Sequence, residues 1–320
     1  MMTSRPVPAY PGYLADPFLL ALHGGFLAYG SSNPEGAARG SVSALSSPDL
    51  RAWSDAGTVM TLDPAIGMDV WAPEVIASGG SFWMHYSAGH GIDGHHLRVA
   101  RADRSTGPFA DLGVDLTPDE RFAIDPHAFR DNDGTWYLFY ARDVLDTDRP
   151  GTHLAVAPMA PSLDRLTGPA MPVLEPNADW QIYARDRPMY GRRFDWHTLE
   201  GPTVFRRDGT YYLFFSGGSW EGPGYGVSYA TAPHPLGPWT HASTRPIVLS
   251  RESTGLIGPG HNSVLRLANG EMVTAFHAWN ADMTKRQMHV RYLVWADGVP
   301  SVDHTRDVVV VPGAASSNRS

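Results

Sequence analysis

The sequence predicts an all-β chain folded as a five-bladed β-propeller, and three observations support this prediction. An aromatic segment that begins at a glycine-containing turn recurs five times along the chain. A short apolar strand precedes each copy, and another strand follows it. The 320 residues include 33 glycines and 27 prolines, which favours many short strands joined by turns over long helices.

The five aromatic segments alternate with a period of two, as strands do. Most start at a GG, DG or NG turn, which is typical of tight hairpins. They are residues 24–31, 79–87, 133–141, 208–216 and 269–278. The strands expected before them are residues 16–20, 73–77, 125–129, 200–205 and 260–265. The strands expected after them are residues 41–46, 96–102, 152–158, 226–232 and 287–294.

Each repeat thus holds three or four antiparallel strands, and radial packing lets each repeat bury its faces against two neighbours. We expect blades at roughly residues 10–60, 61–115, 116–175, 195–250 and 255–310. No linker interrupts the chain, so residues 1–320 are expected to form one catalytic domain. A β-sandwich is the alternative fold, and the internal alignment of the repeats disfavours it.

Composition excludes several classes of protein. The net charge of −8 disfavours nucleic acid as a partner. No run of 18 apolar residues predicts a membrane span, and the absence of cysteine excludes disulfides and thiolate metal sites. Residues 1–13 lack the apolar core of a signal peptide, so we expect a cytoplasmic protein, with a trimmed secreted form as the alternative. The oligomeric state is left open.

A polar residue opens the first strand of every repeat, and these residues should converge near the propeller axis. They are Asp16, Glu74, Asp125, Glu200 and His261. Carboxylates that lie close together raise one another's pKa, and such groups gather at functional sites. Glu74, within WAPE, fits a structural tie between blades equally well. Glycoside hydrolysis needs one carboxylic acid and one carboxylate on opposite sides of the sugar, about 6.5–9.5 Å apart in inverting enzymes.

From about residue 10 to residue 302 the sequence resembles glycoside hydrolase family 43, the pentose-releasing five-bladed propellers. The motifs are LADPFLL, WAPEV, IDPHAF, LEGPTVFRRDGTYYLFFSGG and GPGHNSV, in that order, and KRQMHVRYLVWADGVP resembles the closing strand. The resemblance implies that Asp16 is the general base and Glu200 the general acid. It also implies that Asp125 raises the pKa of the acid and orients it.

Further roles follow from the same resemblance. His261 is similar to a histidine near the axis that in many members contacts Ca²⁺ or another cation, often through water; no cofactor is expected to be required. Arg286 would contact the sugar, with Arg291 as the alternative. Trp71 resembles an aromatic wall of the sugar pocket. Glu74, Trp196 and Trp220 complete the expected substrate-binding residues.

Two segments each allow two interpretations, one functional and one structural. Residues 179–199 read as a long loop leading into Glu200, where Trp180, Tyr183 or Trp196 would either line the leaving-group subsite or only pack the loop. Residues 89–96, with three histidines, read as a solvated loop rather than a metal site.

The expected activity is exo-acting α-L-arabinofuranosidase on arabino- or arabinoxylo-oligosaccharides, with inversion. The alternatives are a β-D-xylosidase, an endo-arabinanase, and a carbohydrate-binding propeller without catalysis. Fructan-cleaving relatives would need an asparagine before the first Asp-Pro, where this chain has Ala15.

Overall fold

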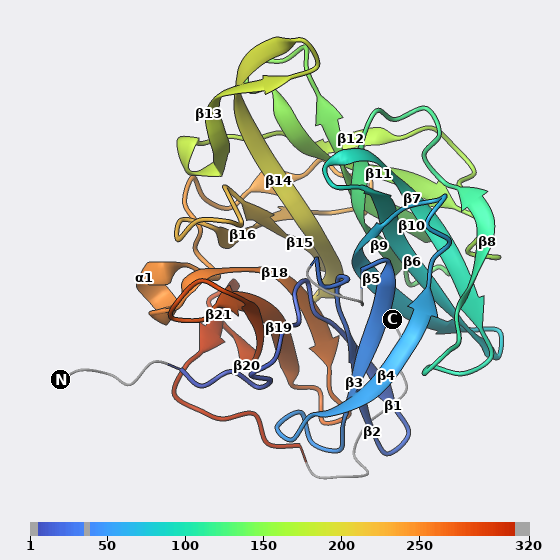
Figure 1. The fold of residues 1–320 in the computed structure, drawn as a ribbon. Helices are drawn as coiled ribbons and strands as arrows, with labels where there is room; N and C mark the ends of the chain where they lie inside the picture. The colour runs from blue at the N-terminus through green and yellow to red at the C-terminus, as the bar shows by residue number, and fades with distance from the viewer. Residues whose placement is uncertain (1–5, 35–38, 311–320) are drawn as a thin grey trace.

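The computed structural model describes residues 6–34 and 39–310, and within them the chain is almost entirely strand (Figure 1). The only helical segments of these residues are the 3-10 turn η1 (Asp179–Gln181) and the four-residue α1 (Arg251–Thr254). None of the helices in the described part of the chain is long and apolar enough to cross a membrane. The all-β prediction is therefore confirmed.

Five groups of four antiparallel strands form the blades. Blade 1 holds β1 (Phe18–Leu22), β2 (Gly25–Tyr29), β3 (Ser41–Ser47) and β4 (Ser54–Thr61). Blade 2 holds β5 (Asp69–Ser78), β6 (Ser81–His90), β7 (Asp93–Ala102) and β8 (Ala110–Asp115). Blade 3 holds β9 (Ala123–Arg130), β10 (Trp136–Val144), β11 (Gly151–Met159) and β12 (Met171–Leu174). Blade 4 holds β14 (Arg192–Arg207), β15 (Thr210–Gly217), β16 (Gly226–Ala232) and β17 (Thr240–His241). Blade 5 holds β18 (Ile257–Arg266), β19 (Met272–Trp279), β20 (Arg286–Ala296) and β21 (Val299–Asp303).

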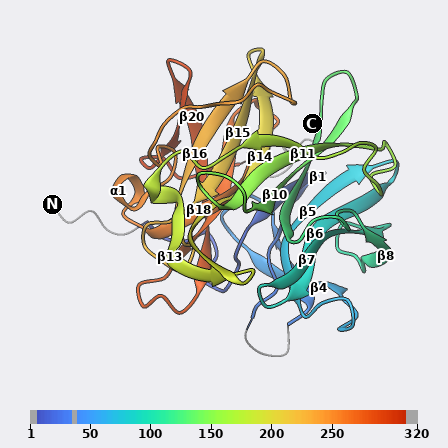
Figure 2. The ribbon, with the colours of Figure 1, turned by 90° about the horizontal axis from the view of Figure 1, so that it is seen from above.

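Buried side chains between neighbouring blades close the ring. Each of five hydrophobic clusters joins two adjacent blades: 1 with 2, 2 with 3, 3 with 4, 4 with 5, and 5 with 1. In the last of these, Leu19 and Phe26 of blade 1 belong to one cluster with Val273 and Tyr292 of blade 5. The first and last blades therefore exclude water from their shared face as the other pairs do. In both Figure 1 and Figure 2, β8 and α1 lie on opposite sides of this ring.

One hairpin departs from the repeat. Strand β13 (Ile182–Met189) pairs antiparallel with the first part of β14, which also bridges β11 in parallel at Gly151 and His197. Figure 1 shows this hairpin extending beyond the blades at the top of the view. Residues 179–199, expected as a loop, are thus largely strand.

Each innermost strand contains, or follows, a residue in the left-handed backbone region at the same point. The φ angles are 53° for Asp16, 45° for Ala72, 59° for Asp125, 56° for Gly201 and 48° for His261. In blades 2 to 5 the strand register shifts across this residue. A β-bulge re-aims the side chains beside it, and such strain is typical of functional sites.

This register corrects the alignment expected from the sequence. Glu200 lies one residue before the left-handed position of its strand, and Glu74 lies two residues after it. The equivalent positions are therefore Asp16, Ala72, Asp125, Gly201 and His261. A proline follows the first four of them, so aligning the repeats on proline gives the observed register.

Candidate active site

Side-chain contacts between blades hold the left-handed residues in place. The Asp16 N–H donates to Nδ1 of His277 in blade 5 (3.1 Å), and the Ala72 N–H donates to Oγ of Ser31 in blade 1 (2.8 Å). The Gly201 N–H donates to Oδ2 of Asp125 in blade 3, and the His261 N–H to Oγ of Ser216 in blade 4. Each such bond joins one innermost strand to the preceding blade, and it satisfies an N–H that the bulge removes from the ladder.

Asp16, Asp125, Glu200 and His261 come together at the axis from four blades. His261 Nδ1 lies 3.4 Å from Asp16 Oδ1 and 3.9 Å from Asp125 Oδ2. One side-chain nitrogen or oxygen from each of Asp125, Glu200 and His261 falls within 4.8 Å of the others. The sequence prediction that these residues converge therefore agrees with the geometry.

Asp16 is surrounded by groups that favour its charged form. Arg286 Nη1 lies 3.3 Å from Oδ1, His277 Nδ1 lies 3.1 Å from the same oxygen, and the Ser31 hydroxyl donates to Oδ2. Burial alone would raise the pKa of Asp16, but Arg286, His261 and His277 outweigh it and hold the pKa well below its usual range. Asp16 is therefore ionised at neutral pH.

Asp125 and Glu200 have the opposite electrostatics. Burial, together with the charge of Asp16, raises the pKa of Glu200 to about 7, against the hydrogen bond that the Tyr225 hydroxyl donates to it (2.5 Å). Burial and the charges of Glu200 and Asp16 raise the pKa of Asp125 well above its usual range. The two carboxyl groups titrate as a pair and retain a proton near neutral pH. Asp125 also fixes the backbone beside Glu200 through the Gly201 N–H.

Arg286, and not Arg291, lies at this site. Its Nη2 donates to the Tyr13 hydroxyl (3.2 Å), and its guanidinium carbon lies 4.5 Å from the ring centroid of Trp220. Trp279 stacks against Trp220 at 6.1 Å and donates from Nε1 to its carbonyl oxygen. Arg291 instead donates to the carbonyl oxygens of Val290 and Val7. A partly exposed aromatic wall therefore stands beside the arginine that contacts Asp16.

Trp71 occupies in blade 2 the position that Glu200 occupies in blade 4, one residue before the left-handed residue. Its ring stacks on His95, with centroids 3.7 Å apart, and His95 Nε2 lies 2.9 Å from the Gly91 carbonyl oxygen. Residues 89–96 therefore form the turn and strand ends of the β6–β7 hairpin. The expected solvated segment agrees with the exposed turn at residues 90–94, but His95 departs from it, because it is buried and packs behind Trp71.

Two expected substrate contacts need correction. Glu74 Oε2 lies 2.8 Å from Nδ1 of His127 in the next blade, which is the inter-blade tie that the sequence left as the alternative. Trp196 is only 2% exposed, and Phe194, Tyr190 and Arg187 cover its ring. Trp196 thus forms the core of the β13–β14 hairpin, and its ring is not available to a sugar.

The other two aromatics of that hairpin differ. Trp180 stacks on Phe215 and packs into the core between blades 3 and 4. Tyr183 remains partly exposed, donates to Glu221 Oε2 (2.8 Å) and lies under the Arg187 guanidinium. Burial, Glu221 and, more weakly, Glu200 raise the pKa of Tyr183, so this tyrosine lies on the side of the site near the acid.

Sequence reasoning missed Ser31, His277 and Tyr225. A serine ends the aromatic segment in blades 1, 2 and 4, and this recurrence could have indicated that Ser31 and Ser216 have a common role. His277 and Tyr225 carried no comparable signal, because their contacts with Asp16 and Glu200 join distant parts of the chain.

Comparison with known proteins shows the family of this chain. The profile of Glycosyl hydrolases family 43 matches residues 5–300. The chain belongs to this family. It is a glycoside hydrolase with the family's five-bladed fold. A solved thermostable family-43 glycoside hydrolase superposes with a TM-score of 0.79 at 29% identity, covering 95% of this chain and 96% of that one. An endo-1,4-β-xylanase from Bacteroides thetaiotaomicron gives 0.77 at 29% identity, over 93% and 96%.

Among curated relatives, the β-D-galactofuranosidase xynD of Aspergillus niger is 25% identical over 88% of this chain and 79% of its own length. An extracellular exo-α-(1→5)-L-arabinofuranosidase of Streptomyces avermitilis is 26% identical over 74% of this chain. The match spans half of that protein.

Proposed function

We propose that this glycoside hydrolase releases a terminal pentose with inversion of configuration, acting as an exo-α-L-arabinofuranosidase on arabino- or arabinoxylo-oligosaccharides. The proposal rests on one observation: the carboxyl groups of the site differ in protonation near neutral pH. Asp16 is held ionised, whereas Glu200 and Asp125 retain a proton near neutral pH. One site therefore offers a base and an acid at the same pH.

In the proposed reaction, the Asp16 carboxylate takes a proton from a water whose oxygen bonds to the anomeric carbon. The bond from that carbon to the leaving oxygen breaks, and Glu200 gives its proton to that oxygen. The Tyr225 hydroxyl donates to Glu200 Oε1, which favours the proton on Oε2. Asp16 then returns its proton to solvent, and the Glu200–Asp125 pair regains one.

Arg286 and the aromatic side chains fit a sugar ring beside these groups. Arg286 places five N–H donors next to Asp16, which suits sugar hydroxyl groups. Trp71 and Trp220 are partly exposed and can present ring faces to the C–H face of a sugar. The β13–β14 hairpin beside the acid, with Tyr183, supports an exo-acting pocket over an open groove.

A cation at the axis stays a secondary proposal. Asp125, Glu200 and His261 offer ligand atoms within 4.8 Å, which suits a hard cation in charge and spacing. A cation bound directly to Glu200 would, however, replace the proton that the acid must donate. We therefore place any Ca²⁺ at His261 through water, where it would supply charge and support, and no reaction step requires it.

The test compares initial rates on nitrophenyl α-L-arabinofuranoside, β-D-xylopyranoside and β-D-galactofuranoside for the wild type and Glu200→Ala. We expect the arabinofuranoside to react fastest, with short arabino-oligosaccharides shortened one unit at a time. A preference for the xyloside would assign a β-xylosidase, and a preference for the galactofuranoside would assign the activity named for xynD. Release from arabinan or xylan alone would contradict exo action.

The place of action is a separate prediction. Two relatives are named as extracellular enzymes, whereas the sequence predicts a cytoplasmic protein. Fractionation of the source cells, with activity assayed in the cell extract and in the medium, decides between them.

A further inference from the structure

Directly behind the catalytic residues, a second set of side chains links the innermost strands. They occupy the position two residues after each left-handed residue: Phe18, Glu74, His127, Thr203 and Ser263. Glu74 reaches His127, and His127 Nε2 reaches the carbonyl oxygen of Val204 (3.2 Å). Thr203 Oγ1 donates to Asn262 O, and Ser263 Oγ donates to Pro17 O, both at 2.7 Å. Each polar member thus contacts the next blade, and only apolar Phe18 interrupts the ring.

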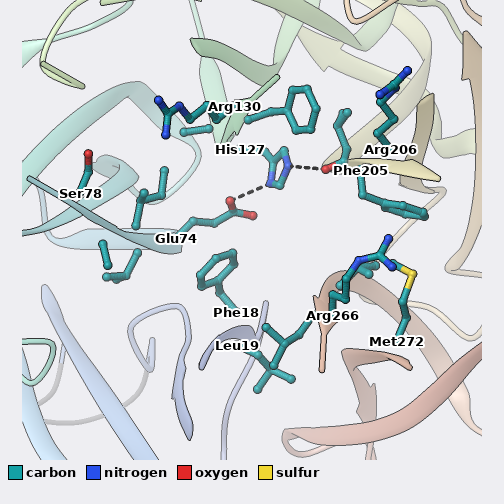
Figure 3. Close-up of a pocket in the computed structure, with 18 of the residues that line it drawn as sticks. Phe18, Leu19, Glu74, Ser78, His127, Arg130, Phe205, Arg206, Arg266 and Met272 are labelled. Atoms are coloured by element: carbon teal, nitrogen blue, oxygen red, sulfur yellow. Dashed lines mark hydrogen bonds and ion pairs between the residues drawn. The ribbon is translucent and has the colours of Figure 1, made fainter. Parts of the chain in front are cut away.

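The charged part of this ring is the Glu74–His127 pair. The pair lines a cavity of about 1010 Å³. Figure 3 shows His127 between Glu74 and the backbone beside Phe205. Both side chains are largely buried, at 13% and 11% exposed. The reaction proposed above uses neither residue.

The contacts of His127 define its protonation. Nδ1 faces a carboxylate oxygen and Nε2 faces a backbone carbonyl oxygen, and neither partner has a proton to donate. With Glu74 as a carboxylate, both ring nitrogens carry hydrogen, which makes His127 an imidazolium. Burial would lower the pKa of His127, but Glu74 and the Val204 carbonyl outweigh it, and the pKa is raised.

The pair spans the three strands that carry Trp71, Asp125 and Glu200. Glu74 lies three residues after Trp71 on β5, His127 lies two residues after Asp125 on β9, and its acceptor Val204 lies four residues after Glu200 on β14. Innermost strands of neighbouring blades share no backbone ladder. Side-chain bonds of this kind therefore add to the hydrophobic clusters and to the β11–β14 bridge in setting their relative positions.

We propose that the Glu74–His127 ion pair is a positioning unit of the active site, which fixes Asp125 and Glu200 relative to each other and holds the Glu74 carboxylate behind them. The proposal rests on the roles of these carboxyl groups proposed above. On the side of the active site, the charge of Glu74 contributes to the raised pKa of Asp125. It also acts against burial, which lowers the pKa of His261. The other charged groups around the pair are Asp16, Glu200 and, lining the cavity, Arg130, Arg206 and Arg266.

Glu74→Gln tests the proposal, because the amide oxygen can still accept from His127 while the charge is lost. We expect kcat to fall about tenfold with KM little changed, since small misplacements of catalytic groups cost up to about 100-fold. The alkaline limb of kcat/KM should move to lower pH, because one cause of the raised Asp125 pKa is removed.

Ser263→Ala is the matched control, because it removes an uncharged link of the same ring. Its pH profile should stay that of the wild type, whatever its melting temperature. Wild-type kcat and pH profile in Glu74→Gln would overturn the proposal. So would a loss of kcat equal to that of Ser263→Ala with an unmoved alkaline limb, since the pair would then be only a structural tie.

A second readout does not depend on activity. ¹⁵N NMR of the histidine rings, with His127 assigned by its absence in His127→Gln, should show both nitrogens protonated at pH 7.5. In Glu74→Gln the ring should lose its proton at lower pH. A neutral His127 in the wild type would overturn the proposal, whereas an enzyme inactive on every glycoside would overturn the proposed function and leave this readout decisive.

Discussion

At the scale of single residues, the same chemical group acquires opposite properties within one site. Asp16 and Glu200 are both buried carboxyl groups close to the axis. Asp16 faces the Arg286 guanidinium and accepts a hydrogen bond from the Ser31 hydroxyl, so its charge is compensated. Burial and the charge of Asp16 raise the pKa of Glu200 and outweigh the hydrogen bond from the Tyr225 hydroxyl, so Glu200 holds its proton to higher pH. Neighbouring groups, rather than residue type, assign the base and the acid.

Replacement of Asp16 by asparagine should abolish general-base catalysis. Asp16→Asn keeps the shape but not the charge, and turnover should fall by about 10²–10⁴-fold. Added azide should restore release of the leaving group, because this small anion can attack the anomeric carbon without a base and form a glycosyl azide. Loss of activity without azide rescue, together with a collapsed melting temperature, would assign Asp16 a structural role.

Replacement of Glu200 by alanine should make the rate depend on the leaving group. Glycosides with dinitrophenyl leaving groups need little protonation, so Glu200→Ala should retain far more activity on them than on oligosaccharides. The two substrate classes are compared as ratios of kcat/KM between variant and wild type. An equal loss on both classes would show that Glu200 is not the acid.

At the scale of strands, a left-handed residue at each innermost strand builds the site. Four of these residues precede a proline, which disfavours right-handed helical backbone before it, and the N–H groups of three of them, Asp16, Ala72 and Gly201, donate to the preceding blade. The sequence predicted the strands because their alternation is local. It misaligned Glu74 and Glu200 because a bulge shifts register without changing composition.

Gly201→Ala tests this conformation. At φ 56° an added Cβ would lie 3.1 Å from Cγ of His261, so the ring that contacts Asp16 would have to shift. We expect loss of about 1–2 kcal/mol of stability and most of the activity. Gly209→Ala is the control, because φ is 86° there but no atom lies within 4 Å of the added Cβ. Equal activities of the two variants would show that the His261 contact is unimportant.

The sequence does not predict which aromatic side chains of the β13–β14 hairpin are buried. Its aromatic and arginine residues indicated a substrate loop, yet Trp196 and Trp180 are packed inside. Which face of such a hairpin is buried depends on contacts with Tyr190 and Phe215, which local patterns do not encode. Tyr183 alone of the three keeps a place near the acid.

At the scale of the whole molecule, closure of the ring brings the site residues together and buries carboxyl groups close to one another. Five repeats could be predicted because each has its own strands and turns, and their closure follows from burying both faces of every blade. The side-chain links across the axis could not be predicted, because they depend on how the blades meet. Closure also forces Asp125 and Glu200 together in a buried space, which raises both pKa values.

The raised pKa of buried Glu200 predicts how the stability of the fold depends on pH. The pKa of Glu200 rises from 4.5 to about 7 on folding, so its unfavourable ionisation removes stability as pH increases through that window. Glu200→Gln cannot ionise and should be more stable than the wild type at pH 8, by at most about 3 kcal/mol. The difference should vanish near pH 4. Urea unfolding at both pH values measures it, and a variant less stable at pH 8 would contradict the account.

In the proposed mechanism, Asp16 acts through water while Glu200 protonates the leaving group. The most direct measurement is ¹H NMR of the sugar during the first minutes of hydrolysis of an α-L-arabinofuranoside, before mutarotation mixes the anomers. The account predicts that β-L-arabinofuranose forms first. First release of the α anomer would mean that a carboxylate attacks the sugar itself, and this would contradict the roles assigned to Asp16 and Glu200.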